Sequence, residues 1–240
     1  MYDVNNTSPE IESSEVETAI LPVGAIEQHG PHLPLSVDWF QGEVVARGVA
    51  AKLNAFLLPC IPYGNSQAHD GFRGSISLSP ETLASIVQDI SLSLLDQGFR
   101  RIAVLNFHAG NVVLKSAIRD LNLNQDIGKV ILVHPHLEAS ESLENILDNL
   151  ECEQHAGELE TSVMMYLAPD RVGVERIDHV PNVTPIYFDY IHMKEFCPDG
   201  IWGRPSLATH EKGGRAVEAM IEATVSCLKT TFSNLDGTSK

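Results

Sequence analysis

The stretch from Glu27 to Asp38, EQHGPHLPLSVD, gathers carboxylates and imidazoles in one short segment. Glu27 and His29 alternate, so in extended backbone their side chains project the same way. Two prolines and a glycine stiffen the segment, which favours a fixed geometry. Carboxylate oxygen with imidazole nitrogen suits zinc, manganese or iron. We therefore interpret the stretch as a metal site, with a polar turn capped by Asp38 as the alternative. His32 either supports the ligands or packs the loop.

A second polar group, NFHAGN, occupies residues 106–111 and follows an apolar run. A lone histidine at a strand end is more often a packed polar residue. Beside the first group, however, His108 is better interpreted as a metal ligand. We expect Asn106 and Asn111 to stabilise the turn through backbone hydrogen bonds rather than to contact substrate.

A third group, HAGELETS, covers residues 155–162, with His155 just before a predicted helix and Glu160 about one turn inside it. Residues two apart on a helix point away from each other, so Glu158 and Glu160 cannot both face one site. The alternative is that these acids only favour the N-terminus of the helix.

Other candidate residues have less support from their neighbours. His69 lies in a glycine-containing loop, HDGFRGSI, where it either supports a ligand or has a structural role. Trp202 is either an aromatic lid or a residue that packs a loop or a subunit interface. Five histidines are not part of any such group of candidate ligands in the sequence and are expected to be structural: His134, His136, His179, His192 and His210.

Short apolar runs alternate with amphipathic segments along the chain. Strands are predicted over 18–24, 55–61, 101–106 and 129–134, and helices over 38–53, 80–97, 111–123, 157–167 and the amphipathic segment near the end. Such alternation indicates an α/β domain with a mainly parallel sheet covered on both faces. In these sheets the ligand site lies beyond the carboxyl ends of the strands, so one crevice can collect the three groups.

The length, charge and cysteine content of the chain indicate how many domains it has, which partners are excluded and where it is located. With 240 residues, 43% of them hydrophobic, the chain suits a single domain over 1–240, with 1–17 as an N-terminal segment and 233–240 as a flexible tail. A net charge of −16 argues against nucleic acid and anionic membranes as partners. Four scattered cysteines, a polar start and the lack of a spanning apolar run predict a cytoplasmic protein with reduced thiols.

The motifs together resemble the creatininase (creatinine amidohydrolase) family. The stretches that carry the likeness are LPVGAIEQHGPHLPLSVD, YGNSQAHDGFRGSISL, NFHAGN, HAGELETS and GIWGRPSLAT with the following KGG. They spread over residues 21–214. The motifs in this order identify the family more specifically than any one motif alone. The resemblance implies a three-layer α/β/α fold, two divalent metal ions and a homo-oligomer, often a hexamer built as a trimer of dimers.

The resemblance also implies roles by position. Glu27 would bind one metal and His29 the other, Asp38 would bridge them, and His108 would complete the first set. Members that hydrolyse creatinine have a tyrosine and a metal-binding glutamate directly after that histidine. This chain has Ala109 and Gly110 there.

The creatinine hydrolases also carry a Trp-Asp pair before the HAG box, where this chain has Glu151 and Cys152. The creatinine-specific pocket is therefore missing, and the second metal lacks a ligand. Glu160 is the candidate replacement. His155 matches a histidine near the substrate, which suggests an acid/base role.

The expected function is that of a two-metal amidohydrolase. It would cleave an amide, lactam or formamide C–N bond of a small polar substrate other than creatinine, using a water activated by two zinc, manganese or iron ions. Family members act on creatinine, formamidopyrimidine-type intermediates or short peptides. A metal-dependent peptidase is the alternative enzyme, and a non-catalytic metabolite-binding protein is the alternative from another class.

Overall fold

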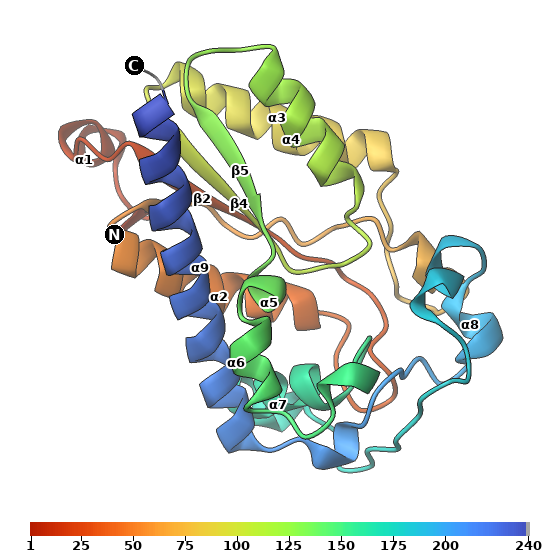
Figure 1. The fold of residues 1–240 in the computed structure, drawn as a ribbon. Coiled ribbons are helices and arrows are strands. Elements are labelled where there is room, and N and C mark those ends of the chain that lie inside the picture. The colour runs from red at the N-terminus through yellow and green to blue at the C-terminus, as the bar shows by residue number, and fades with distance from the viewer. Residues whose placement is uncertain (239–240) are drawn as a thin grey trace.

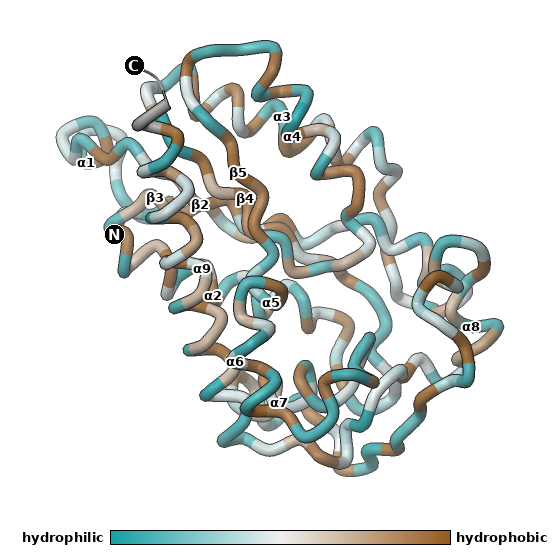
Figure 2. The backbone as a smooth tube through the Cα atoms, in the orientation of Figure 1, coloured by the Kyte–Doolittle hydropathy of each residue, from teal (hydrophilic) through white to brown (hydrophobic). Residues whose placement is uncertain are grey.

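A parallel five-stranded sheet forms the centre of the computed structural model, which describes residues 1–238 (Figure 1). The strand order is β1-β3-β2-β4-β5. The strands are β1 (Tyr2–Asp3), β2 (Thr18–Val23), β3 (Phe56–Leu57), β4 (Arg101–Asn106) and β5 (Lys129–Val133). β2 and β4 are almost wholly buried and apolar, as strands covered on both faces must be (Figure 2).

Helices cover both faces of the sheet and complete the predicted three-layer fold. α2 (Val37–Leu53), α7 (Glu158–Leu167) and the long α9 (His210–Thr238) share one apolar core with the short helix α6 (Ser140–Glu144). The short helix α5 (Pro135–Glu138) packs against α9. α3 (Pro80–Asp96) and α4 (Val113–Leu123) pack on the opposite face, with α1 (Ser8–Ser13) at its edge. Figure 1 shows the sheet between α2 and α9 on one side and α3 and α4 on the other.

The register of β2 and β4 brings two of the polar groups together. Val23 pairs with Asn106, so both strands end at the same level. The backbone N–H of Phe107 also donates to the carbonyl of Val23 at 2.9 Å. The loops that begin at residues 24 and 107 therefore leave the sheet side by side.

Local signals explain where α3 starts and stops. The Ser79 hydroxyl accepts a hydrogen bond from the backbone N–H of Thr82, and Pro80 occupies the first turn. Gly98 follows the helix with φ of +102°, a left-handed conformation that glycine adopts readily. The predicted serine cap and glycine stop of this helix are thus confirmed.

The structure differs from prediction in one strand and near the end of the chain. The strand expected over 55–61 is reduced to β3, since Pro59 lacks a backbone N–H, and only Ile61 pairs again, with Val23. Residues 1–17 contain β1 and α1. The tail expected over 233–240 is helical as far as Thr238 because Phe232 anchors α9 in the core; residues 239–240 lie outside the described part.

Short elements make up the segment between α6 and α9. Besides α7 it contains α8 (Met193–Phe196) and the 3-10 helices Leu150–Cys152, Pro169–Arg171, Pro185–Asp189 and Pro205–Leu207. A further 3-10 helix, Gln67–His69, lies between β3 and α3. Within residues 1–238, every helix is too short or too polar to cross a bilayer.

Candidate metal centre

The three predicted groups converge at the carboxyl end of the sheet. Glu27 and His29 follow β2, Asp38 lies in the first turn of α2, and His108 follows β4. All four side chains are buried, with relative exposures between 0% and 7%. Glu160 reaches them from α7. A set of ionisable groups this deeply buried requires partners that balance its charge.

One set of ligand atoms comes from Glu27, Asp38 and His108. Nδ1 of His108 lies 3.3 Å from Oε1 of Glu27 and 3.4 Å from Oδ2 of Asp38. The three ligand atoms are close enough to hold one metal ion.

A second set comes from His29, Asp38 and Glu160. Nε2 of His29 lies 3.3 Å from Oδ1 of Asp38 and 3.6 Å from Oε1 of Glu160. This set also has the spacing of a metal site. Because Asp38 faces His29 with Oδ1 and His108 with Oδ2, its carboxylate joins the two sets.

The histidine rings are held so that one nitrogen of each faces the carboxylates. Nδ1–H of His29 donates to the carbonyl of Glu27 at 3.1 Å, and Nε2–H of His108 donates to the carbonyl of Asn65 at 2.9 Å. When either ring is neutral, its other nitrogen is an acceptor that faces the carboxylates. Metal-binding histidines are typically oriented in this way, by a backbone carbonyl behind the ring.

The donor atoms suit divalent cations. Oε2 of Glu27, Nε2 of His29 and Oδ2 of Asp38 are buried and have no hydrogen-bond partner. Buried polar atoms without partners are uncommon and need an explanation such as a missing ion. Nitrogen and carboxylate oxygen are ligands for zinc, manganese and iron. The residues present therefore fit a pair of such ions.

The carboxylates also make the site strongly attractive to positive charge. Burial opposes the charged form of His29, yet the nearby Glu160 and Asp38 carboxylates outweigh it and raise the pKa of His29 well above its usual value. Burial likewise opposes ionisation of Glu27, but the neighbouring His108 and His69 rings hold its pKa well below the usual range. The shift at His29 reflects the negative potential of the two carboxylates, and a metal ion bound here would take the place of the ring proton.

Backbone geometry at the start of α7 orients Glu160. The N–H of Ala156 donates to Oε2 of Glu160 at 2.6 Å, which leaves Oε1 facing His29. Ala156 has φ of +53°, a conformation that costs free energy for alanine. Glu158 points elsewhere, to the Lys212 ammonium and the N–H of Asp148, as the helical spacing predicted.

His155 lies against the same cluster. Its Nε2–H donates to the carbonyl of Gln28 at 2.7 Å, and its Nδ1 lies 3.8 Å from Oε1 of Glu27. Burial and the adjacent His29 lower the pKa of His155. Paired backbone hydrogen bonds with Trp202 hold the segment in place. Trp202 itself is buried among aromatic rings, so it packs the loop rather than forming an exposed lid.

His69 belongs to the site, a point that the sequence left open. Its Nδ1 accepts from the Gln28 side-chain amide at 3.1 Å, so Nε2–H faces Oε1 of Glu27 at 3.3 Å. Burial lowers the pKa of His69 to about 3. His32 instead hydrogen-bonds to the Thr161 hydroxyl at 2.9 Å. His69 therefore orients a candidate ligand, whereas His32 connects the loop to α7.

The two asparagines stabilise the turn around His108, as predicted. The side-chain amide of Asn106 donates to the carbonyl of His108 at 2.7 Å. The amide of Asn111 donates to Oδ1 of Asn106 at 2.9 Å, and Oδ1 of Asn111 accepts from the N–H of Asn65.

His136 lies near the site although we expected only a structural role. It is partly buried, the Glu160 and Asp38 charges act on it, and its Nε2–H donates to Oε1 of Gln41 at 2.8 Å. Its position just after β5 could have indicated this, because residues beyond the carboxyl ends of strands line the crevice.

Two positions that differ from the creatinine hydrolases, Ala109 and Gly110, have different surroundings in the structure. Ala109 is exposed. A Cβ atom at Gly110 would lie 2.4 Å from Nε2 of His108 and 2.4 Å from the Asn65 carbonyl oxygen, so a side chain cannot be accommodated without movement.

Comparison with known proteins gives a consistent result. The family described as Creatininase: Creatinine amidohydrolase matches residues 5–228. The creatinine amidohydrolase of Pseudomonas putida is 31% identical over 235 residues, covering 89% of each chain. The mycofactocin precursor peptide peptidase of Mycobacterium tuberculosis (strain ATCC 25618 / H37Rv) is 30% identical over 249 residues, covering 97% of this chain and 89% of that protein.

Solved structures agree with the sequence relatives. A structure described as "Creatininase Mn" superposes with a TM-score of 0.82 at 26% identity, covering 96% of this chain and 98% of that one. A mutant creatininase described as Zn-Zn type has a TM-score of 0.80 with the same identity and coverage. Manganese and zinc are thus associated with structures of this fold.

Proposed function

Since this chain belongs to the creatininase family, a family whose named relatives are hydrolases, we propose that it is a two-metal amidohydrolase acting on a small polar amide, lactam or formamide. The single observation that carries the proposal is the Asp38 carboxylate, whose two oxygens face imidazole nitrogens of different ligand sets. A structural ion pair would not require this double arrangement.

We assign one ion to Glu27, Asp38 and His108, and the other to His29, Asp38 and Glu160. Such ions, when bound, polarise a carbonyl oxygen and lower the pKa of water. The chain itself supplies orientation: His69 holds Glu27, and the Ala156 N–H holds Glu160. Burial of these groups keeps bulk water away, which strengthens each electrostatic contact.

His155 is the proposed acid/base. Because its Nε2–H is bonded to the Gln28 carbonyl, its Nδ1 is the nitrogen free to exchange a proton. His155 would accept a proton from the attacking water and pass it to the leaving nitrogen. Such proton transfer typically contributes about 10²–10⁴-fold to the rate.

The substrate is proposed not to be creatinine. Ala109 and Gly110 offer neither the tyrosine nor the glutamate of the creatinine hydrolases, and Glu151 and Cys152 stand where those enzymes have Trp-Asp. A small formamide or other polar amide is our first choice. Peptide hydrolysis is the second candidate, favoured by the likeness to a peptide peptidase over 97% of this chain.

Metal analysis combined with a substrate panel tests the proposal. We expect close to two equivalents of zinc, manganese or iron per chain, and metal-dependent hydrolysis of formamides or short peptides but not of creatinine. His155→Ala should lower turnover and retain the metal, whereas Asp38→Ala should lose both. A purified protein that binds no metal under saturating zinc or manganese would refute the enzyme and favour the non-catalytic alternative.

Two further properties stay predictions. The resemblance implies a homo-oligomer, often a hexamer, which light scattering of the purified protein would test. The absence of a suitable membrane helix within residues 1–238 is compatible with the predicted cytoplasmic location, and fractionation of cells would test it.

A further inference from the structure

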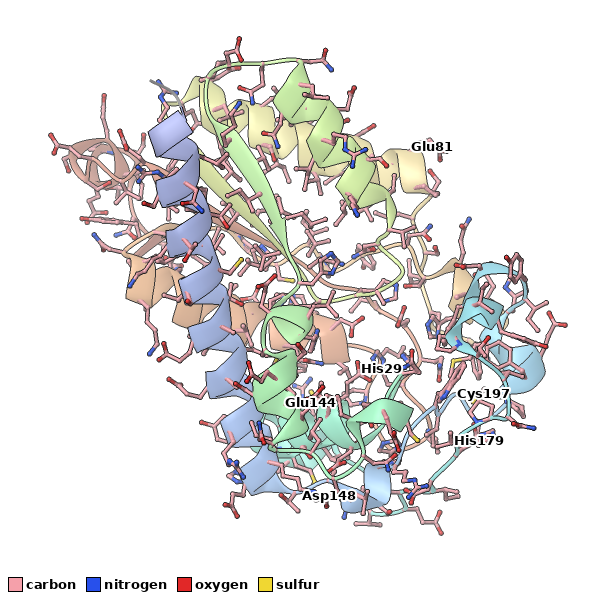
Figure 3. All side chains as sticks on the ribbon, in the orientation of Figure 1. His29, Glu81, Glu144, Asp148, His179 and Cys197 are labelled. Carbon is pink, nitrogen blue, oxygen red and sulfur yellow. The ribbon has the colours of Figure 1, made fainter. Side chains whose placement is uncertain are left out.

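A second group of metal-ligand atoms lies outside the candidate centre. His179, Cys197 and Asp199 offer a nitrogen, a sulfur and an oxygen that all lie within 4.8 Å of one another. Figure 3 shows Cys197 and His179 close together near α8, away from His29. The proposed hydrolase does not use these side chains, and the sequence analysis treated His179 as structural.

The three side chains face a common point. Nδ1 of His179 lies 2.8 and 2.7 Å from the two oxygens of Asp199 and 3.5 Å from Sγ of Cys197. Sγ of Cys197 is also 3.6 Å from Oδ1 of Asp199. A relay of cysteine, histidine and aspartate would need the thiol and the carboxylate on opposite ring nitrogens. Here both face Nδ1, so the arrangement does not suit nucleophilic catalysis. A bound cation would replace the proton that Nδ1 of His179 shares with Asp199 and the proton that Sγ of Cys197 donates to the carbonyl of Ile201.

The backbone holds the group in position. His179 and Gly203 exchange two backbone hydrogen bonds, of 3.1 and 2.8 Å, which join two segments about twenty residues apart. Gly200 turns the chain after Asp199 with φ of +73°, and a Cβ there would lie 1.8 Å from Oε1 of Gln28. The N–H of Ile201 donates to Oδ1 of Asp199 at 3.1 Å. The ligand atoms are therefore preorganised by fixed backbone.

Exposure differs among the three in a way that suits a site at the protein surface. Cys197 is fully buried, while the His179 and Asp199 side chains are 30% and 38% exposed. A cation would thus reach the Cys197 sulfur from solvent by passing the His179 and Asp199 side chains. Its fourth ligand position would be on the solvent side.

We propose that His179, Cys197 and Asp199 bind zinc or a divalent cation with similar ligand preferences. This ion would be separate from the two metal ions proposed at the candidate catalytic centre. Thiolate, imidazole and carboxylate are all established zinc ligands. The cation would link residue 179 to the segment 197–203. That segment contains Trp202, whose backbone pairs with His155, so the ion would hold the loop against the proposed acid/base.

Cobalt substitution provides a selective test. Cobalt(II) bound to a thiolate gives a sulfur-to-metal charge-transfer absorption in the near ultraviolet, which oxygen and nitrogen ligands do not give. The candidate catalytic centre offers only oxygen and nitrogen. We expect this band in the cobalt-loaded full chain, its loss on titration with zinc, and a third equivalent of metal per chain.

Variants make the test specific. Cys197→Ser should abolish the band and the third equivalent, while Cys227→Ser should retain both, because Cys227 lies on α9 outside any such group. Asp199→Asn, at a more exposed position, serves as a second variant if Cys197→Ser does not fold, and it should weaken cobalt binding by more than ~10-fold.

Two outcomes would overturn the site: no thiolate band in the wild-type protein, or a band that persists in Cys197→Ser. Either would leave the group as an ion pair of His179 with Asp199 beside a thiol. Asp38→Ala separates this inference from the proposed function, because it should remove the catalytic pair and keep the thiolate band.

Discussion

Oε1 of Glu160 lies 3.6 Å from Nε2 of His29. The glutamate that the creatinine hydrolases carry after the NxH motif is absent here, and Gly110 stands in its place. We propose that Glu160, which lies on α7 fifty residues after Gly110, supplies the missing oxygen donor beside Asp38 and Glu27. With Glu160 in this role, each proposed metal ion has three candidate ligands.

Glu160→Gln tests that relationship. The amide keeps the size of the side chain but removes the negative charge that faces His29. We expect the affinity for one of the two metal ions to fall by more than ~100-fold. Removing a residue that binds the metal directly should weaken binding more than removing one that only hydrogen-bonds to a ligand. Metal content after dialysis, measured by mass spectrometry, should drop toward one equivalent.

Glu151→Gln is the matched control, because Glu151 is exposed on the 3-10 helix Leu150–Cys152. It should retain the wild-type metal content. Retention of both equivalents in Glu160→Gln would mean that Glu160 is not a ligand.

Gly110→Ala should disturb the His108 side of the site. The added methyl would lie 2.4 Å from Nε2 of His108 and from the Asn65 carbonyl oxygen, so one of them must move. We expect a loss of about 1–3 kcal/mol in the free energy of unfolding, as for overpacking elsewhere, together with weaker metal binding. Urea unfolding and metal titration measure the two effects.

Ala109→Ser, at the adjacent exposed position, is the control and should change neither quantity. Unaltered stability and metal binding in Gly110→Ala would show that the turn can relax, and that a glutamate could be restored there.

The ion pair between Glu158 and Lys212 is expected to stabilise the fold. The Glu158 carboxylate is fully buried and also accepts from the N–H groups of Asp148 and Asn149. Glu158→Ala leaves the ammonium and both N–H groups without this partner. We expect a loss of about 3–5 kcal/mol in the free energy of unfolding.

Glu222→Ala provides the comparison, because Glu222 pairs with Lys52 at 2.5 Å on the exposed surface. Solvent screens that pair, so its loss should have a much smaller effect. Equal melting temperatures for the two variants would contradict the role given to the buried pair.

Glu153 should make stability depend on pH. Burial raises the pKa of Glu153 to about 8, although the N–H groups of Glu158 and Leu159 donate to its carboxylate. An unfolded glutamate titrates near 4.5. Between these values the folded protein keeps a proton that the unfolded chain has released. The contribution of Glu153 to stability is therefore lost as pH rises, by up to ~1.4 kcal/mol per pH unit.

Glu153→Gln imitates the protonated side chain and cannot ionise. The free energy of unfolding, measured in urea between about pH 5 and about pH 8, should fall less steeply with pH than in the wild type. The wild type and Glu153→Gln share all other titrating groups, so the contributions of those groups to the pH dependence of stability cancel in the comparison. Identical slopes would mean that Glu153 is ionised throughout.

The sequence by itself determined the fold class and most of the candidate ligands. Apolar runs followed by polar loops predict a parallel sheet, and the carboxyl ends of parallel strands meet at one edge. Glu27, His29 and His108 could therefore be assigned to one crevice from their positions after strands. Helical spacing alone decided that Glu158 and Glu160 face different ways.

Only the tertiary structure decided how distant groups meet. The contact of His69 with Glu27 and that of His179 with Cys197 each join residues that lie far apart in the sequence, on segments that are not part of one helix or strand. Local spacing determines which side of an element a residue faces. Which element it then meets depends on long-range packing, and that is settled only when the whole chain has folded.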